Sequence, residues 1–203
     1  MEESRIRELA AAEGFAAAAV IPVNELVFVP EYRKYCEENS CGNYGANYGC
    51  PPDCGTPEVM KARVLAHTHA AVFQTRTQVR DFMDDREMKK LKKRHTEMTW
   101  KLLEKLKQEG MDQNGFPIMC GPCGICPVCH KTEETPCVCP EKMASCLSAY
   151  CIDAGKLRNG NSVGWEYRVF FQSVHILKRV DKSMDFMVSF GLGRTNDKQK
   201  HSV

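Results

Sequence analysis

The pattern of apolar and polar residues predicts helices that alternate with short strands. Between Asp81 and Glu109, apolar residues recur in steps of three and four opposite a strongly charged face, so this stretch is the clearest helix of the chain. Thr56 followed by Pro57 is typical of a helix start, because the hydroxyl caps the first turn and proline fits the first helical position. The predicted helices span residues 4–13, 32–36, 57–67, 81–109 and 142–156.

Short runs rich in small, β-branched or aromatic residues predict the strands, which are expected at residues 15–21, 69–75, 165–177 and 184–190. Strands interleaved with helices favour an α/β fold, or an α+β fold, with a small mixed sheet flanked by helices. We expect residues 1–203 to form a single domain, with two cysteine-rich loops that meet at one end of the sheet.

The stretch from Cys120 to Cys139 contains six of the chain's 12 cysteines. Four of them, Cys120, Cys123, Cys126 and Cys129, recur every third residue, as in ferredoxin loops, where a curled backbone turns successive thiolates toward one cluster. Glycines and prolines between them disfavour a regular helix. An iron–sulfur cluster fits this spacing; zinc bound by paired cysteines and a disulfide framework are the alternatives.

A second cysteine-rich loop precedes it, with four thiols in a segment broken by glycines and by two consecutive prolines. They are Cys36, Cys41, Cys50 and Cys54. The proline after Cys50 matches the Cys-Pro pair that ends cluster loops in ferredoxins. This loop, residues 36–54, is expected to form a second metal site or the other half of the first.

The composition indicates which partners the protein lacks and in which compartment it functions. A net charge of +2 offers no strong field for nucleic acid or anionic membrane. No apolar run approaches the ~18 residues of a membrane span, and the charged start lacks the features of a secretory signal. We therefore expect a cytoplasmic protein, in which 12 cysteines indicate metal or redox chemistry because disulfides rarely persist there.

Other cysteines and histidines carry weaker signals. Cys146 and Cys151 fall in the predicted helix 142–156, where a single cysteine is usually a small buried hydrophobe. His67 and His69, at a helix–strand junction, are expected to be solvent-facing or hydrogen-bonded rather than metal ligands. No role is assigned to Cys120 or Cys139 individually.

The combined motifs resemble a family of predicted metal-binding proteins, a domain of unknown function found mainly in anaerobic bacteria and archaea. The first half of the pattern is Cys36, Asn39, Cys41, Gly42, Tyr44, Gly45, Cys50, Pro51, Pro52, Gly55 and Thr56. The second half is Gly121, Cys123, Cys126, Cys129, Pro136, Cys137, Pro140, Glu141, Ser145, Ile152 and Asp153. The resemblance implies one complete ligand set, Cys123, Cys126, Cys129 and Cys137, and a set of three, Cys36, Cys41 and Cys50, which Cys54 could complete.

Three functions are compatible with these features. The first is electron transfer by one or two [4Fe–4S] clusters in anaerobic metabolism, with a redox partner protein. The second is an enzyme in which a three-cysteine cluster leaves one iron open to a small-molecule substrate, as catalytic metal sites keep an open position. The third is an interaction module stabilised by zinc. No catalytic acid, base or nucleophile is singled out.

Overall fold

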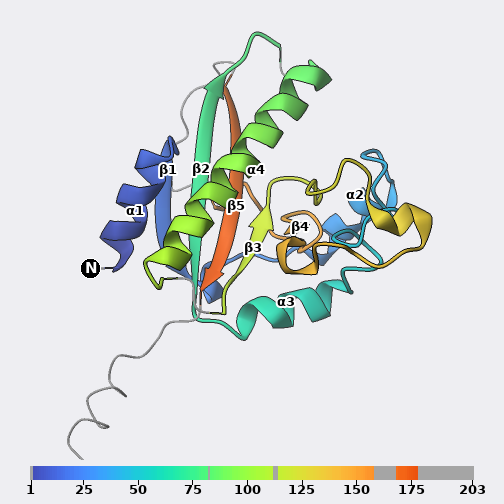
Figure 1. The fold of residues 1–203 in the computed structure, drawn as a ribbon, viewed down its shortest axis with the longest axis horizontal. Helices are drawn as coiled ribbons and strands as arrows, with labels where there is room; N and C mark the ends of the chain where they lie inside the picture. Colours follow the sequence, from blue (N-terminus) through green and yellow to red (C-terminus); the bar gives the residue numbers. More distant parts are fainter. Residues whose placement is uncertain (1, 82, 112–113, 158–167, 178–203) are drawn as a thin grey trace, which may run out of the picture.

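A five-stranded mixed sheet forms the centre of the protein in the computed structural model, which describes residues 2–81, 83–111, 114–157 and 168–177 (Figure 1). In sequence order the strands are β1 (Ala17–Pro22), β2 (His69–Gln78), β3 (Phe116–Met119), β4 (Ser145–Cys146) and β5 (Arg168–Leu177). Their order across the sheet is β1-β2-β5-β3-β4. The pairs β1–β2, β2–β5 and β5–β3 are antiparallel, whereas β3 and β4 pair parallel. The α/β class with a small mixed sheet is confirmed.

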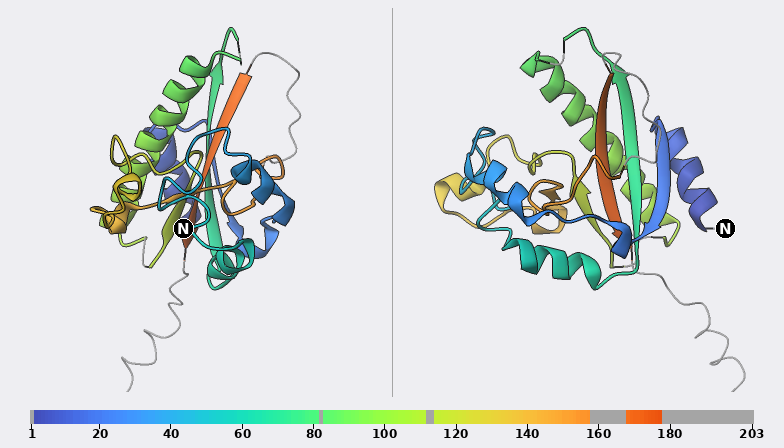
Figure 2. Two further views of the ribbon diagram at one scale, coloured as in Figure 1. Left: turned by 90° about the vertical axis from the view of Figure 1, so that its right-hand side faces the viewer. Right: turned by 180° about the vertical axis from the view of Figure 1, so that it is seen from behind.

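Helices cover both faces of this sheet. The helices α1 (Glu2–Ala12) and α4 (Asp85–Gln108) lie on one face, and α3 (Pro57–Leu65) lies on the other (Figure 2). Because side chains alternate along a strand, Ala71 and Phe73 of β2 pack beneath α1 and α4, whereas Ala70 and Val72 pack beneath α3. The sheet therefore separates two hydrophobic cores.

The helix caps agree with the predictions from the sequence. The Thr56 side chain accepts a hydrogen bond from the Val59 N–H at the start of α3. Asp84 caps α4 by accepting from the N–H groups of Arg86 and Glu87, so this helix begins four residues later than predicted. The strand predicted at 184–190 and residues 165–167 of the strand predicted at 165–177 lie outside the described residues.

The helix predicted over residues 142–156 is wrong. A short 3₁₀ helix, Pro140–Lys142, leads instead into β4 and a series of turns. Leu147 donates its N–H to the carbonyl of Met119, and Cys151 adopts a left-handed φ of 55°. Tertiary packing overrides helix propensity here, because this segment buries Ala144 in the core under α4 and Tyr150 and Ile152 in the core under α3. One face of a helix could not reach both.

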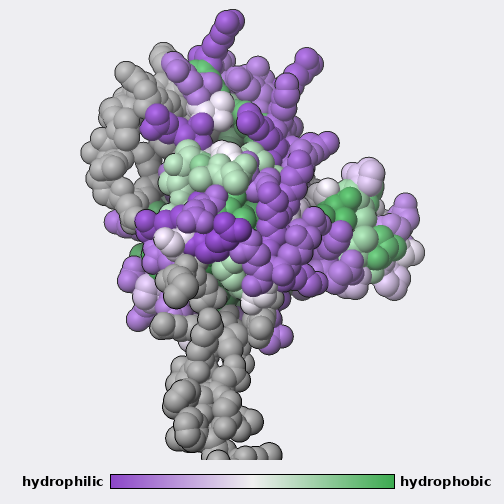
Figure 3. Space-filling model, turned by 60° about the vertical axis from the view of Figure 1, so that its left-hand side comes forward, coloured by the Kyte–Doolittle hydropathy of each residue, from purple (hydrophilic) through white to green (hydrophobic). Residues whose placement is uncertain are grey.

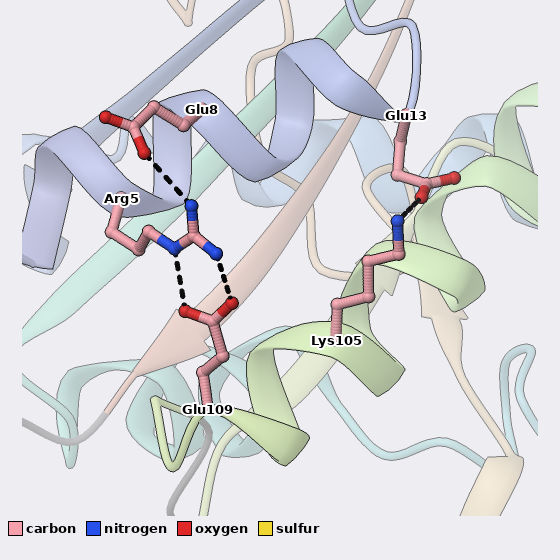
Figure 4. A network of polar contacts seen from close by, with 5 residues as sticks. All are labelled: Arg5, Glu8, Glu13, Lys105 and Glu109. Carbon is pink, nitrogen blue, oxygen red and sulfur yellow. Dashed lines mark hydrogen bonds and ion pairs between the residues drawn. The ribbon is translucent and has the colours of Figure 1, made fainter.

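Ion pairs join the exposed sides of α1 and α4 (Figure 4). Arg5 donates to both carboxylate oxygens of Glu109, at 2.8 and 2.6 Å, and to Glu8, while Lys105 pairs with Glu13. Exposed pairs of this kind contribute little to stability, so the contact between the two helices depends mainly on their buried residues. Among the described residues, no helix combines the length and apolar character needed to cross a membrane.

A buried histidine in α4 makes stability sensitive to pH. The His95 ring is 1% exposed, and its Nδ1 lies 2.9 Å from the Thr75 hydroxyl. Burial lowers the pKa of His95 to about 4 from an ordinary 6.5, so between these values the unfolded chain binds the proton that the folded chain excludes. Stability should fall as pH decreases through this window.

From pH 7.5 to pH 5, we expect His95 to remove about 2 kcal/mol from the unfolding free energy, measured by urea titration. The matched control is His95→Gln, which carries no titratable ring and should lack this part of the pH dependence. Equal slopes for the two proteins over this range would contradict the assignment.

Candidate metal centre

The two cysteine-rich loops pack against each other in a lobe beyond the β4 edge of the sheet (Figures 1 and 2). The buried Asn47 side chain donates to the carbonyl of Cys123 at 2.9 Å, and the Tyr48 hydroxyl donates to the carbonyl of Thr135 at 2.9 Å. An ion pair between Lys131 and Asp53, at 2.6 Å, links the same two loops. The expected meeting of the loops at one end of the sheet is confirmed.

Local backbone chemistry shapes the first loop. Asn39 adopts a left-handed φ of 53°, and its side-chain oxygen accepts from the Tyr44 N–H at 2.9 Å. Asparagine is one of the few residues other than glycine that tolerate this conformation. Gly45, at a φ of 68°, donates its N–H to the carbonyl of Pro51. The motif residues between the cysteines therefore curl the chain and bring its thiols toward one region.

Five cysteines of the second loop line one small hollow that is partly open to solvent. They are Cys123, Cys126, Cys129, Cys137 and Cys139. Asn47 and Tyr48 of the first loop and Met143 contribute to the same wall. The structure thus brings together the four cysteines implied by the family resemblance, and it adds Cys139, for which the sequence indicated no role.

The electrostatics of Cys126 reflect this crowding. Desolvation raises the pKa of Cys126, and the neighbouring thiols Cys139, Cys123, Cys137 and Cys129 raise it further. Several thiolates cannot gather here without a compensating positive charge. The hollow is therefore chemically suited to a cation or a metal cluster that neutralises them.

The thiols of the first loop and Cys146 of β4 lie near enough to raise one another's pKa. Burial and then the charge of Cys146 raise the pKa of Cys36 to about 11, opposed by Arg33. The same two causes, in the same order, raise the pKa of Cys50. Cys146 lies on a strand and not on the predicted helix, but it packs partly buried against the core under α3, in line with the expected hydrophobic role.

Arg33 connects the segments that carry these thiols. It lies one turn before Cys36, at the start of α2 (Arg33–Glu37), which follows a short 3₁₀ helix, Pro30–Tyr32. Its guanidinium donates to the carbonyl of Gly55 at 2.9 Å and to the carbonyl of Ala149 at 2.8 Å. One cation therefore ties α2 to the end of the first loop and to the turn after β4.

Other cysteines point elsewhere. The Cys54 thiol lies 3.5 Å from the Met60 sulfur of α3, and Cys151 donates to the carbonyl of Pro30 at 3.7 Å. Cys120 contacts the Thr96 hydroxyl of α4 at 3.7 Å. His67 bonds the carbonyls of Arg63 and Asn114, so the expectation of a hydrogen-bonded histidine is confirmed.

The spacing of the thiols bears on what they could hold. All 12 cysteines lie in the described part of the chain, and none forms a disulfide. Among the described residues, no three His, Cys, Asp or Glu side chains lie close enough to hold one metal ion. Thiolates that share one zinc ion at about 2.3 Å stand about 3.8 Å apart. The five cysteines around the hollow thus do not form a ready-made site for a single tetrahedral ion.

Comparison with known protein families gives a match over most of the chain. The model of a family described as "Predicted metal-binding protein (DUF2284)" matches residues 19–183, which include both cysteine-rich loops, most of β1 and the whole of the other four strands. No curated protein and no solved structure matches this chain. The matched region covers most of the 203 residues. This chain therefore belongs to that family of predicted metal-binding proteins.

Proposed function

We propose that this protein is an iron–sulfur protein that carries electrons in the reductive metabolism of an anaerobic cell. The observation that carries the proposal is the hollow lined by five thiols, with His130 as its one imidazole and no carboxylate. Soft thiolate sets select iron–sulfur clusters, zinc or copper(I) over hard cations. Cys123, Cys126, Cys129 and Cys137 would hold a [4Fe–4S] cluster, with Cys139 beside them.

The openness of the hollow favours a cluster over zinc. The ligands of a four-iron cluster stand farther apart than those of one zinc ion, because the inorganic core lies between them. This arrangement agrees with thiols that share one hollow without approaching single-ion distances. When bound, a [4Fe–4S] cluster supplies reversible one-electron transfer at a potential set by burial, charge and hydrogen bonds to sulfur.

The surface around the hollow suits a transient redox partner. Val128 and Val138, on the loop that carries the thiols, are 64% and 58% exposed. Hydrophobic residues gather on the projecting lobe, whereas hydrophilic residues cover much of the body seen from this side (Figure 3). A small apolar patch beside a shallow metal centre permits brief docking of an electron donor or acceptor. We place this exchange in a reducing cytoplasm, where 12 unpaired cysteines are stable.

Reduction of anaerobically purified protein tests the electron-carrier role. We expect absorption near 400 nm that bleaches with dithionite and returns on mild oxidation, with a paramagnetic resonance signal of the reduced cluster and no substrate present. Coloured protein that does not undergo reversible reduction, or whose signal shifts on binding a small molecule, would favour the alternative of an open-site enzyme.

A further inference from the structure

Cys146 lies close to the point where the sheet meets the first loop. It ends β4, the edge strand of the sheet, and the lobe with both cysteine-rich loops lies beyond this edge (Figure 1). A Cβ atom placed on Gly49 would lie 2.7 Å from the carbonyl oxygen of Ala144, so the backbones meet there without space for a side chain. Cys50 and Cys146 each lie within two residues of this contact.

The chain segments on either side of this contact are also fixed together. Phe28 and Ile152 form an antiparallel bridge, and the Val29 N–H donates to the carbonyl of Cys151 at 2.8 Å. The segment that leads into α2, and thus to Cys36, is therefore paired with the segment that follows Cys146. Arg33 adds a second tie through its bond to Ala149.

Hydrogen bonding distinguishes Cys146 from Cys54. The Cys146 sulfur accepts the Ala149 N–H at 3.4 Å, as metal-bound thiolates commonly accept backbone N–H groups. Both cysteines pack against the core under α3, but the Cys54 thiol donates to the carbonyl of Gly55 at 3.9 Å and lies 3.5 Å from the Met60 sulfur.

From this geometry we propose that Cys146 is the fourth ligand of a second [4Fe–4S] cluster, with Cys36, Cys41 and Cys50 as the other three. This inference rests on the proposed function, since it assumes that the chain binds iron–sulfur clusters. It replaces Cys54, the candidate favoured by sequence proximity, with a thiol about a hundred residues away in the chain. A closed set of four thiolates makes the second centre an electron carrier and leaves no open iron for a substrate.

Metal content of two single variants tests the assignment. Wild-type protein and the variants Cys146→Ser and Cys54→Ser would be purified anaerobically, reconstituted with iron and sulfide, and desalted. We expect about eight iron atoms per wild-type chain, about four in Cys146→Ser and about eight in Cys54→Ser, for clusters of four irons each. Paramagnetic resonance of the reduced proteins should show interacting clusters in the wild type and in Cys54→Ser, and one isolated cluster in Cys146→Ser.

The cluster of the second loop, held by Cys123, Cys126, Cys129 and Cys137, serves as an internal control for folding, because that loop packs against the first. A Cys146→Ser protein that keeps all its iron overturns the proposal, and so does one that loses all of it, since Cys146 would then act on the whole lobe. Loss of four irons in Cys54→Ser alone would restore Cys54 as the ligand. If the wild-type protein holds about four irons, the cluster proposed for Cys36, Cys41, Cys50 and Cys146 does not exist, but the proposed function stands. If it holds none, the proposed function itself is refuted.

Discussion

Replacing Cys126 with serine is expected to remove the cluster of the second loop and about half of the total iron. Cys126 lies among four other thiols that line the same hollow, and its pKa responds to all four. A serine hydroxyl is a much harder and less acidic ligand than a thiol, so one position of the set would be lost. Iron and acid-labile sulfide per chain, together with absorption near 400 nm, would measure the loss.

Cys120→Ser is the matched control for this variant. Cys120 belongs to the same run of three-residue spacings, but its thiol contacts Thr96 and the carbonyl of Lys92 in α4 rather than the hollow. This variant should keep its full iron content. Equal losses from both variants, or no loss from Cys126→Ser, would show that the hollow does not define the ligand set.

Gly49→Ala is expected to lower the occupancy of both clusters, because Gly49 lies where the two loops and the β4 edge meet. Its added Cβ would stand 2.7 Å from the Ala144 carbonyl oxygen and 3.2 Å from the Cys123 Cβ. Backbone atoms cannot move aside as a flexible side chain can, so the loops must separate. Overpacking of this kind costs about 1–3 kcal/mol, which thermal unfolding of the holoprotein would detect alongside the loss of iron.

The control for Gly49→Ala is Gly121→Ala, the same substitution on the second loop. A Cβ on Gly121 would meet no atom within 4 Å, and its backbone is not left-handed. Stability should change by less than about 0.5 kcal/mol, and the iron content should not change. If Gly49→Ala behaves like Gly121→Ala, the close packing of the two loops is not required for the metal centres.

Local sequence patterns correctly predicted the elements that are stabilised by contacts between residues close together in the chain. The apolar stripe of α4, the Thr56 cap of α3 and the apolar run of β2 are each readable within a dozen residues. The glycines, prolines and closely spaced cysteines likewise predicted that the two loops are irregular and carry thiols toward a shared region.

The features of the fold that the sequence did not predict depend on pairing between residues far apart in the chain. The helix expected over 142–156 fails because Ser145 and Cys146 pair with β3, about 27 residues earlier in the chain. The resulting strand places Cys146 at the β4 edge, partly buried against the core under α3 and close to the first loop. The scattered apolar positions from Ala144 to Ile152 lack the stripe of a one-sided helix, and this was the available signal.

The most direct test of the central claim is the quantification of iron, acid-labile sulfide and zinc in protein purified without oxygen. The two sets of thiols predict about eight iron and about eight sulfide per chain, with zinc well below one equivalent. Colourless protein that contains stoichiometric zinc and no sulfide would contradict the account.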